Sequence, residues 1–286
     1  MRWLIVNADD LGLTASVNAG IARAHRQGIV TSASLMANLP EAARTVTLIR
    51  RNPALGVGLH LNLTAGYSLT DCPALTWTDG SFLPLLRVLL RVAISRRARE
   101  QAWTEMEAQA DEAQRLRVPI DHLDSHHHIH LFRPLRRQAI SLARDLNVPM
   151  RLPAEHLSAG DWLHDRGAGL ASFLASRLRR RRDMPRSADH TLGLRLHRAG
   201  FDGPTLVKAL TAIPRGVTEF MCHPGRTDAA LKHLSRYTVG RERELAALTH
   251  PGLRAALDEA GIRLITWKQL PDVSTGFPRT QNDRLG

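Results

Sequence analysis

The sequence predicts an α/β fold in the form of an irregular or incomplete (β/α) barrel. Apolar stretches of strand length alternate with helical stretches about seven or eight times. The chain has 286 residues and 43% hydrophobic content, which suits one large core. It contains neither GxGxxG nor GxxxxGK, which argues against nucleotide binding. We expect one barrel domain over residues 1–270, with insertions at about 65–95 and 154–192 and a loose tail over 271–286.

The first part of the chain alternates regularly. The predicted strands are residues 3–8, 29–36 and 55–61, and the predicted helices are residues 15–27, 41–51 and 98–117. The segment between the predicted helices at 41–51 and 98–117 also contains residues that break periodicity, namely Pro73, Asp79-Gly80 and Pro84. We therefore expect residues 65–95 to be irregular, and a loop this long in a compact domain is usually functional.

The second part alternates less regularly. The predicted strands are residues 121–125, 148–152, 216–222 and 262–267, with a further short strand near Leu194. The predicted helices are residues 133–146, 205–213, 241–248 and 252–260. Residues 154–192 show few periodic signals, and we expect a helical or partly disordered insertion. Glu219 is expected to face a helix or the solvent.

A cluster of histidines follows the strand at residues 121–125. Continued alternation would place His126, His128 and His130 on one side and His127 on the other. Crowded imidazoles repel when protonated and leave unpaired nitrogens when buried, so such a cluster usually binds a metal or a polar substrate. A solvated histidine-rich loop or an engineered tag is the alternative, but a tag is not expected in mid-chain after an apolar strand.

Other chemically capable residues share a position at the C-terminal end of a predicted strand: Asp9, Asp10, His60, Arg151 and His223. In α/β barrels these ends open into one mouth. Adjacent carboxylates repel unless a cation holds at least one of them, although they could also cap the next helix, as could Thr14 or Ser16. A lone histidine such as His60 is more often a core residue, and only its position suggests a ligand.

One carboxylate and two imidazoles form a mixed oxygen and nitrogen site that leaves positions for water and substrate. Asp10, His60 and His126 fit this role. A divalent cation held there, Mg²⁺ or Zn²⁺, could polarise a carbonyl group and acidify a bound water.

The remaining residues at the strand ends suit proton transfer. Asp9 could act as general base, and Arg151 could keep it ionised through a bidentate pair. His223 could protonate a leaving nitrogen as general acid. This set would hydrolyse an amide or an ester, and a metallo-phosphoesterase could use the same ligands. Cys222 is expected to be buried and inert rather than a nucleophile.

Four segments resemble, in the same order, the signature blocks of the YdjC-type carbohydrate deacetylases, which include the chitin-disaccharide deacetylases. They are NADDLGLT at 7–14, GLHLNLT at 58–64, HLDSHHHIH at 122–130 and MCHPG at 221–225. The resemblance extends to about Trp267. It implies a deformed (β/α) barrel of the glycoside hydrolase and deacetylase type, and removal of N-acetyl groups from amino sugars with magnesium or zinc as cofactor.

By position in these blocks, the resemblance assigns the metal ligands to Asp10, His60 and His126, the base to Asp9 and the acid to His223. It implies that His128 and His130 line the sugar site or support the ligands, and Asn62 is a further expected substrate contact. The expected substrate is an N-acetylated amino sugar, an oligosaccharide or a glycolipid, since a related branch acts on glycosylated hopanoid lipids.

The net charge of +12 raises the possibility of nucleic-acid binding. Nearly all of the positive charge is arginine and only 5% of residues are aromatic, so no nucleic acid is expected. Arginines cluster at 87–99 and at 177–182 beside apolar residues. Such segments can contact an anionic membrane surface, although solvated arginines beside core contacts are the simpler interpretation. A homodimer is possible.

Two cysteines, Cys72 and Cys222, cannot form a disulfide framework, which suits a reducing compartment. The N-terminal apolar run meets Asp9 and Asp10 too early for a signal peptide, and no stretch is long enough to span a membrane. The sequence therefore predicts a cytoplasmic protein.

Overall fold

The structure is a computed structural model that describes residues 1–155, 175, 177–178, 184–194, 196, 201–235 and 237–270. The predicted tail at 271–286 lies outside the described residues, as does much of the predicted insertion at 154–192, including the arginines at 179–182.

The core of the fold is a parallel sheet of seven strands, in the order β4-β3-β2-β1-β6-β5, with β7 paired to β1. The strands are β1 (Arg2–Leu11), β2 (Ser32–Leu35), β3 (Gly56–Leu61), β4 (Ile120–Ser125), β5 (His190–Leu192), β6 (Gly216–Cys222) and β7 (Ile262–Leu264). β1 is central because it pairs with β6 on one edge and with both β7 and β2 on the other. The predicted α/β class is confirmed.

The sheet curls into an incomplete barrel whose two outer strands are linked through residues 150–152. Met150 forms an isolated parallel bridge to Leu123 of β4, and its backbone N–H donates to the carbonyl of Arg186. Thr191 of β5 donates its hydroxyl to the carbonyl of Leu152 at 3.2 Å. The predicted strand at 148–152 is therefore only a single bridge. β4 and β5 each bond a few of its residues, and neither forms a continuous ladder with it.

Period-two alternation separates the inside of the barrel from the helical layer. On β1, Trp3 and Ile5 join Val217 of β6 in a cluster inside the barrel, whereas Leu4 and Val6 pack in the large cluster with the helices. Asn7 and Asp9 continue the inner row toward the C-terminal end of β1, and both are buried. The inner face is therefore apolar at one end and polar at the other.

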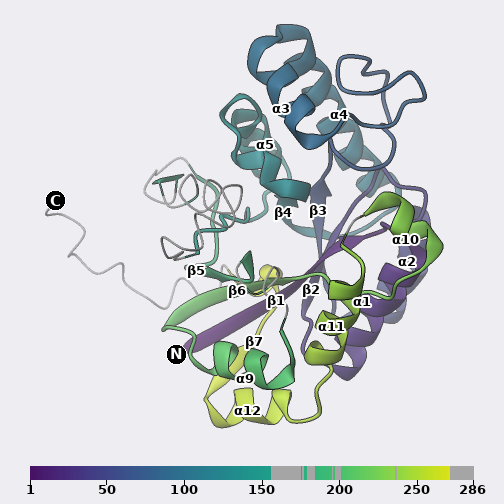
Figure 1. Cartoon of the computed structure of the whole chain (residues 1–286). Helices are drawn as coiled ribbons and strands as arrows, with labels where there is room; N and C mark the ends of the chain where they lie inside the picture. Colours follow the sequence, from purple (N-terminus) through teal and green to yellow (C-terminus); the bar gives the residue numbers. More distant parts are fainter. Residues whose placement is uncertain are drawn as a thin grey trace, which may run out of the picture.

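Helices surround the sheet (Figure 1). They are α1 (Ala15–Gln27), α2 (Ala42–Arg51), α3 (Leu85–Ile94), α4 (Arg96–Arg115), α5 (Arg133–Asp145), α9 (Gly203–Thr211), α10 (Ala229–Leu234), α11 (Val239–Leu248) and α12 (Leu253–Glu259). α3, α4 and α5 form one group beside β3 and β4, and the other helices lie on the side of β1 and β6 (Figure 1). No helix among the described residues has the length and continuous hydrophobicity that a bilayer crossing requires.

Three expectations about the elements need correction. Residues 65–95 are not irregular throughout, because α3 occupies the second half, where Val88 and Val92 supply a buried helical face. The short strand lies at His190–Leu192, where it pairs with β6, rather than at Leu194. α10 was not predicted, since its six residues give too few turns for a periodic signal.

The packing of α1 against the loop after β6 generates a prediction about stability. A Cβ atom on Gly20 would lie 2.6 Å from the Cα of Gly225, which is backbone and cannot rotate away. We expect Gly20→Ala to lower the free energy of unfolding by about 1–3 kcal/mol through overpacking, although alanine is intrinsically the better helix former by roughly 1 kcal/mol.

Urea unfolding monitored by circular dichroism measures this change. Gly252→Ala is the matched control, because the nearest atom to its added Cβ is 3.7 Å away. Equal stability of the two variants would show that α1 can shift without cost.

Candidate metal centre

The C-terminal end of β1 brings two carboxylates into the mouth of the barrel. Asp10 has a φ of 70°, a left-handed conformation that aspartate tolerates better than most residues. Asp9 contacts Arg151, whereas Asp10 faces His60, His126 and Arg241. The backbone turn at Asp10 therefore gives the two neighbouring carboxylates separate partners in the same mouth.

Asp10, His60 and His126 converge on one point. His60 Nε2 lies 3.4 Å from Asp10 Oδ1, and His126 Nδ1 lies 3.2 Å from the same oxygen. Metal–ligand bonds of about 2.0–2.2 Å place neighbouring ligand atoms roughly 3.0–3.5 Å apart in tetrahedral or octahedral sites. The spacing of these three residues thus fits a small divalent cation.

The two oxygens of Asp10 have different surroundings. Asp10 Oδ1 is buried and accepts no hydrogen bond from any described residue. Its other oxygen accepts from Arg241 Nη2 at 2.5 Å, and Arg241 is buried too. Burial raises the pKa of Asp10, but Arg241 and His126 outweigh it and hold that pKa well below its usual value. A carboxylate with a lowered pKa and one oxygen that accepts no hydrogen bond suits a metal ligand.

Asp124 of β4 fixes the orientation of His60. His60 Nδ1 lies 2.7 Å from Asp124 Oδ1, so Nδ1 carries the proton and Nε2 faces Asp10. Burial alone would lower the pKa of His60, but Asp124, Asp10 and Asp9 raise it to about 10. A cation bound by Nε2 would have to displace any proton on that nitrogen.

Asp9, His60 and Asp124 form a second group with ligand atoms within 4.8 Å of one another. Arg151 already bonds both of its carboxylates, with Nη1 2.7 Å from Asp9 Oδ2 and 2.7 Å from Asp124 Oδ2. This second group is therefore neutralised by a guanidinium, and the set of Asp10, His60 and His126 is the better candidate for a metal.

Arg151 is buried among three carboxylates. It binds Asp9 in a bidentate pair, with Nη1–Oδ2 at 2.7 Å and Nη2–Oδ1 at 2.8 Å, as the sequence predicted. Its Nε donates to Glu219 Oε1 at 2.7 Å. Burial raises the pKa of Asp9, but Arg151 outweighs this and holds it below its usual value. The expectation that Glu219 faces a helix or solvent is wrong, because Glu219 lies on the inner row of β6 and is fully buried.

The histidine run does not continue β4. The chain turns after Ser125, with φ of 54° at His127 and 53° at His128, inside a short 3₁₀ segment at His126–Leu131. The predicted alternation is therefore wrong beyond Ser125. His126 turns toward Asp10, whereas the exposed His127 contacts the Thr64 hydroxyl through Nδ1 at 3.0 Å.

The three residues predicted to contact substrate are less exposed than His127: His128, His130 and Asn62. His130 is buried, its Nε2 lies 3.0 Å from the carbonyl of Arg151, and burial lowers its pKa to about 4, so it supports Arg151. His128 is half-buried, with its ring centroid 6.3 Å from that of His130. Asn62 is buried and anchors the following turn, accepting from the backbone of Thr64 and Ala65 at 3.0 Å. Its amide is thus engaged within the chain.

His223 follows β6 and approaches Asp9 from across the mouth, with Nε2 4.0 Å from Asp9 Oδ2. Its backbone N–H donates to Glu244 Oε2 at 2.5 Å, and the Tyr237 hydroxyl donates to Glu244 Oε1 at 2.6 Å. α11 and the loop before it therefore hold the backbone of His223 in place. Cys222 is buried with a raised pKa because of its burial, as expected for an inert thiol.

Three residues of this site were missed from the sequence: Asp124, Arg241 and Glu244. Asp124 lies within the histidine block, so its position beside the cluster was a usable signal. Arg241 and Glu244 come from α11, far along the chain, and no local pattern separates them from other charged helix residues.

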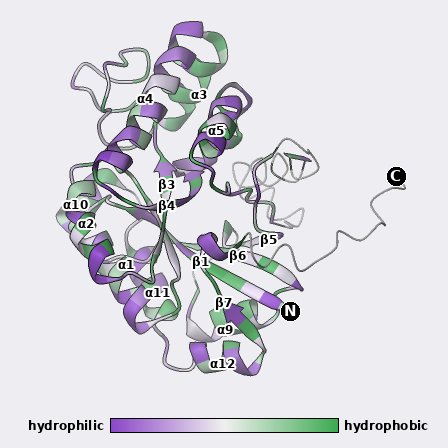
Figure 2. Ribbon diagram, turned by 180° about the vertical axis from the view of Figure 1, so that it is seen from behind, coloured by the Kyte–Doolittle hydropathy of each residue, from purple (hydrophilic) through white to green (hydrophobic). Residues whose placement is uncertain are grey.

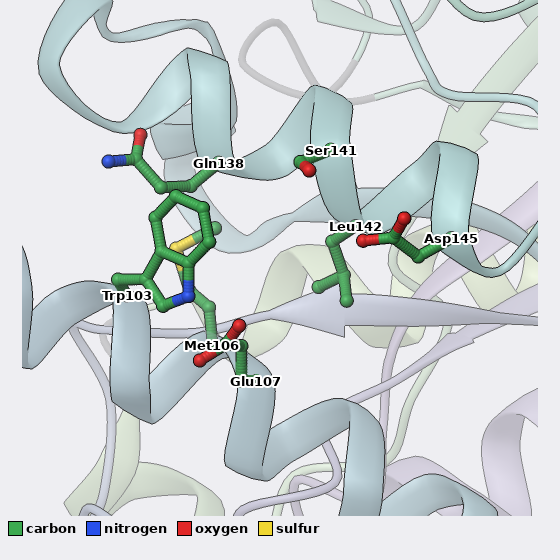
Figure 3. A pocket seen from close by; sticks show the side chains of 7 residues that line it. All are labelled: Trp103, Met106, Glu107, Gln138, Ser141, Leu142 and Asp145. Atoms are coloured by element: carbon green, nitrogen blue, oxygen red, sulfur yellow. The ribbon is translucent and has the colours of Figure 1, made fainter.

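A pocket outside the mouth is lined by residues of α4 and α5, among them Trp103, Met106 and Leu142 (Figure 3). It holds none of the predicted site residues, and it lies where the two helices pack together. The chemistry of the chain is instead concentrated at the strand ends.

The chain is similar to known proteins over most of its length. The family model described as "YdjC-like protein" matches residues 3–259. A carbohydrate deacetylase from Geobacillus stearothermophilus is 33% identical, covering 94% of this chain and 98% of its own length. One from Vibrio campbellii is 31% identical, covering 93% and 96%. A crystal structure of a proposed cellobiose-phosphate cleavage protein from Enterococcus faecalis V583 has a TM-score of 0.75 and 27% identity, covering 94% and 98%. The chain therefore belongs to the YdjC-like family.

Proposed function

We propose that this protein is a metal-dependent deacetylase that hydrolyses the N-acetyl group of an amino sugar in an oligosaccharide or a glycolipid. The observation that carries the proposal is the convergence of His60 Nε2 and His126 Nδ1 on the unbonded oxygen of Asp10, beside Asp9 and His223. The relatives named carbohydrate deacetylase, which match nearly the whole chain, support the substrate class.

In the proposed site, Asp10, His60 and His126 would hold Mg²⁺ or Zn²⁺. When bound, such a cation supplies a Lewis acid for an amide carbonyl and lowers the pKa of water. The chain's own contribution begins with Asp124, which keeps Nε2 of His60 directed at the ligand position. Arg241 occupies the second oxygen of Asp10, so that only Oδ1 faces the two imidazoles.

Asp9 and His223 would transfer the protons. Asp9 accepts a proton from the water that attacks the amide carbon, and Arg151 keeps Asp9 ionised for this step. His223 donates a proton to the amide nitrogen as the C–N bond breaks, releasing acetate and a free amine. The separation of 4.0 Å between His223 Nε2 and Asp9 Oδ2 supports a base and an acid that act on the same substrate amide. Acetate release from N-acetylglucosamine oligomers and lipid-linked glycans tests this reaction, and phosphate release from phosphate esters would favour a phosphoesterase instead.

Removing a ligand should abolish metal binding and activity together. We expect His126→Ala and Asp10→Asn to purify without stoichiometric divalent metal and to lose acetate release, because each removes one of three donors. Asparagine is chosen at Asp10 because it tolerates the left-handed backbone there. Elemental analysis and an acetate assay measure both properties.

His127→Ala is the matched control for these ligand variants. His127 is the immediate neighbour of His126 but points to Thr64 at the surface. Normal metal content in His126→Ala would contradict the ligand assignment.

Replacement of the base should separate binding from catalysis. We expect Asp9→Asn to keep its metal and to lose roughly 10²- to 10⁴-fold in turnover, because an amide cannot accept the proton from water. Metal content and thermal stability should be measured with the rate, since Asp9 also pairs with Arg151. Turnover close to that of the unmodified protein would exclude Asp9 as the base.

Loss of the carboxylate that orients His60 should weaken metal binding without removing a ligand. We expect Asp124→Asn to lower metal affinity by roughly 10- to 100-fold, as seen for partners of metal-ligating histidines. Competition with a chelating dye measures the affinity. Asp121→Asn is the matched control, because Asp121 bonds His122 rather than a candidate ligand, with Oδ1 2.6 Å from Nδ1. Equal losses in both variants would mean that the strand, not the carboxylate, is responsible.

A further inference from the structure

α3 has two apolar faces, although it packs against the protein with only one. Val88 and Val92 are fully buried, whereas Leu86, Leu90 and Ile94 are 79%, 60% and 74% exposed. The three exposed residues are four positions apart and therefore form one stripe along the helix. A stripe of large side chains in water is unusual on a helix that otherwise packs normally.

The loop before α3 extends this apolar surface with aromatic rings. Trp77 is 48% exposed and Tyr67 is 50% exposed. The guanidinium of Arg87 lies 5.0 Å from the centre of the Trp77 ring, which joins the loop to α3. Tyr67 forms a bridge with Ser81, and the backbone N–H of Trp77 donates to the carbonyl of Ser81. The backbones of both residues are thus held by one small turn that precedes the helix.

The same region is strongly basic. Residues 80–99 contain five arginines and no aspartate or glutamate, and the arginines are Arg87, Arg91, Arg96, Arg97 and Arg99. Arg87 and Arg91 are exposed and lie along one flank of the stripe, since they follow Leu86 and Leu90 by one position. We call this surface the α3 face: Tyr67, Trp77, Leu86, Arg87, Leu90, Arg91 and Ile94.

We propose that the α3 face docks the protein on an anionic lipid surface. Apolar side chains on a helix with flanking arginines, together with tryptophan and tyrosine, are the combination that binds the interface between lipid tails and head groups. α3 lies at the outer edge of the molecule, and its ribbon is mostly hydrophobic (Figures 1 and 2). A second copy of this chain is a poorer occupant, because a symmetric contact would bring Arg87 and Arg91 of both copies close together.

The position of the α3 face gives this contact a consequence for the candidate metal centre. The loop with Tyr67 and Trp77 begins after Thr64, whose hydroxyl contacts His127 beside the metal ligands. Tyr67 of the α3 face therefore follows this contact by only three residues. If the proposed function holds, docking on lipid suits an acetylated sugar that is linked to a lipid. Docking does not depend on deacetylation, so an experiment can contradict either proposal without the other.

Flotation of the full-length protein with vesicles tests the proposal. We expect binding to phosphatidylcholine vesicles that contain phosphatidylglycerol, and little binding to phosphatidylcholine alone. L86Q/L90Q/I94Q should bind at least about tenfold more weakly, because each exposed apolar side chain contributes to partitioning. Arg87→Gln with Arg91→Gln should lose roughly fivefold for each arginine. All of these substitutions are at exposed positions, so the fold should survive, as circular dichroism would verify.

The matched controls carry the same changes elsewhere. Val239→Gln removes an apolar residue of α11 that is 58% exposed, and Arg50→Gln with Arg51→Gln removes two exposed arginines of α2. Both should bind vesicles like the unmodified protein. Brominated lipids should quench the fluorescence of Trp77 on binding, and Trp77→Phe should remove that part of the quenching.

Three results would overturn the proposal. They are failure of the unmodified protein to float with anionic vesicles, equal loss of binding in the control variants, and flotation without quenching of Trp77. If L86Q/L90Q/I94Q instead turns a dimer into a monomer in sedimentation experiments while no vesicle binds, the α3 face is an interface between copies of this chain.

Discussion

The balance of buried charge at the mouth of the barrel is the constraint on which the site depends. Asp9 and Asp10 are buried at the C-terminal end of β1 and Asp124 is buried at the C-terminal end of β4, and their mutual repulsion would be costly. Arg151 neutralises Asp9 and Asp124, and Arg241 bonds one oxygen of Asp10. Among the oxygens of these three aspartates that the structure describes, Asp10 Oδ1 is left without a hydrogen bond, and it lies between two imidazole nitrogens. By bonding the other carboxylate oxygens, the two arginines thus leave Asp10 Oδ1 as the candidate ligand atom.

The fold was largely predictable because the buried strands of a parallel sheet have an easily recognised hydrophobic pattern. Strands buried on both faces appear as continuous apolar runs, and β1, β3, β4 and β6 were found close to their real bounds. α3 was missed because Pro73, Asp79-Gly80 and Pro84 precede it, and these breakers were taken to interrupt the whole segment. The histidine run was assigned a strand-like alternation that the left-handed backbone at His127 and His128 prevents.

Site residues could be predicted where an aspartate, histidine or arginine lies at the C-terminal end of a predicted strand. The structure brings all of the residues predicted at strand ends to one mouth, although the predicted strand before Arg151 is only an isolated bridge: Asp9, Asp10, His60, His126, Arg151 and His223. Glu219 was misplaced because a charged residue inside a strand normally faces water, whereas here the inside of the barrel supplies Arg151. Arg241 and Glu244 depend on how α11 docks, and only the tertiary structure shows that.

The mouth and the α3 face are connected by one short stretch of chain. Asn62 fixes the turn after β3, Thr64 contacts the histidine run, and the loop then leads to the exposed rings and to α3. Glu105 and Gln109 of α4 are buried beneath this loop and bond its backbone, so the loop is held by a helix rather than left free. The structure thus places a candidate catalytic centre and a candidate docking surface on one supported segment.

The most direct measurement is the anomalous X-ray diffraction of crystals grown with Zn²⁺. The account predicts one strong anomalous peak about 2.0–2.2 Å from Asp10 Oδ1, His60 Nε2 and His126 Nδ1 together. A peak held by other side chains, or by only one of these three, would contradict it.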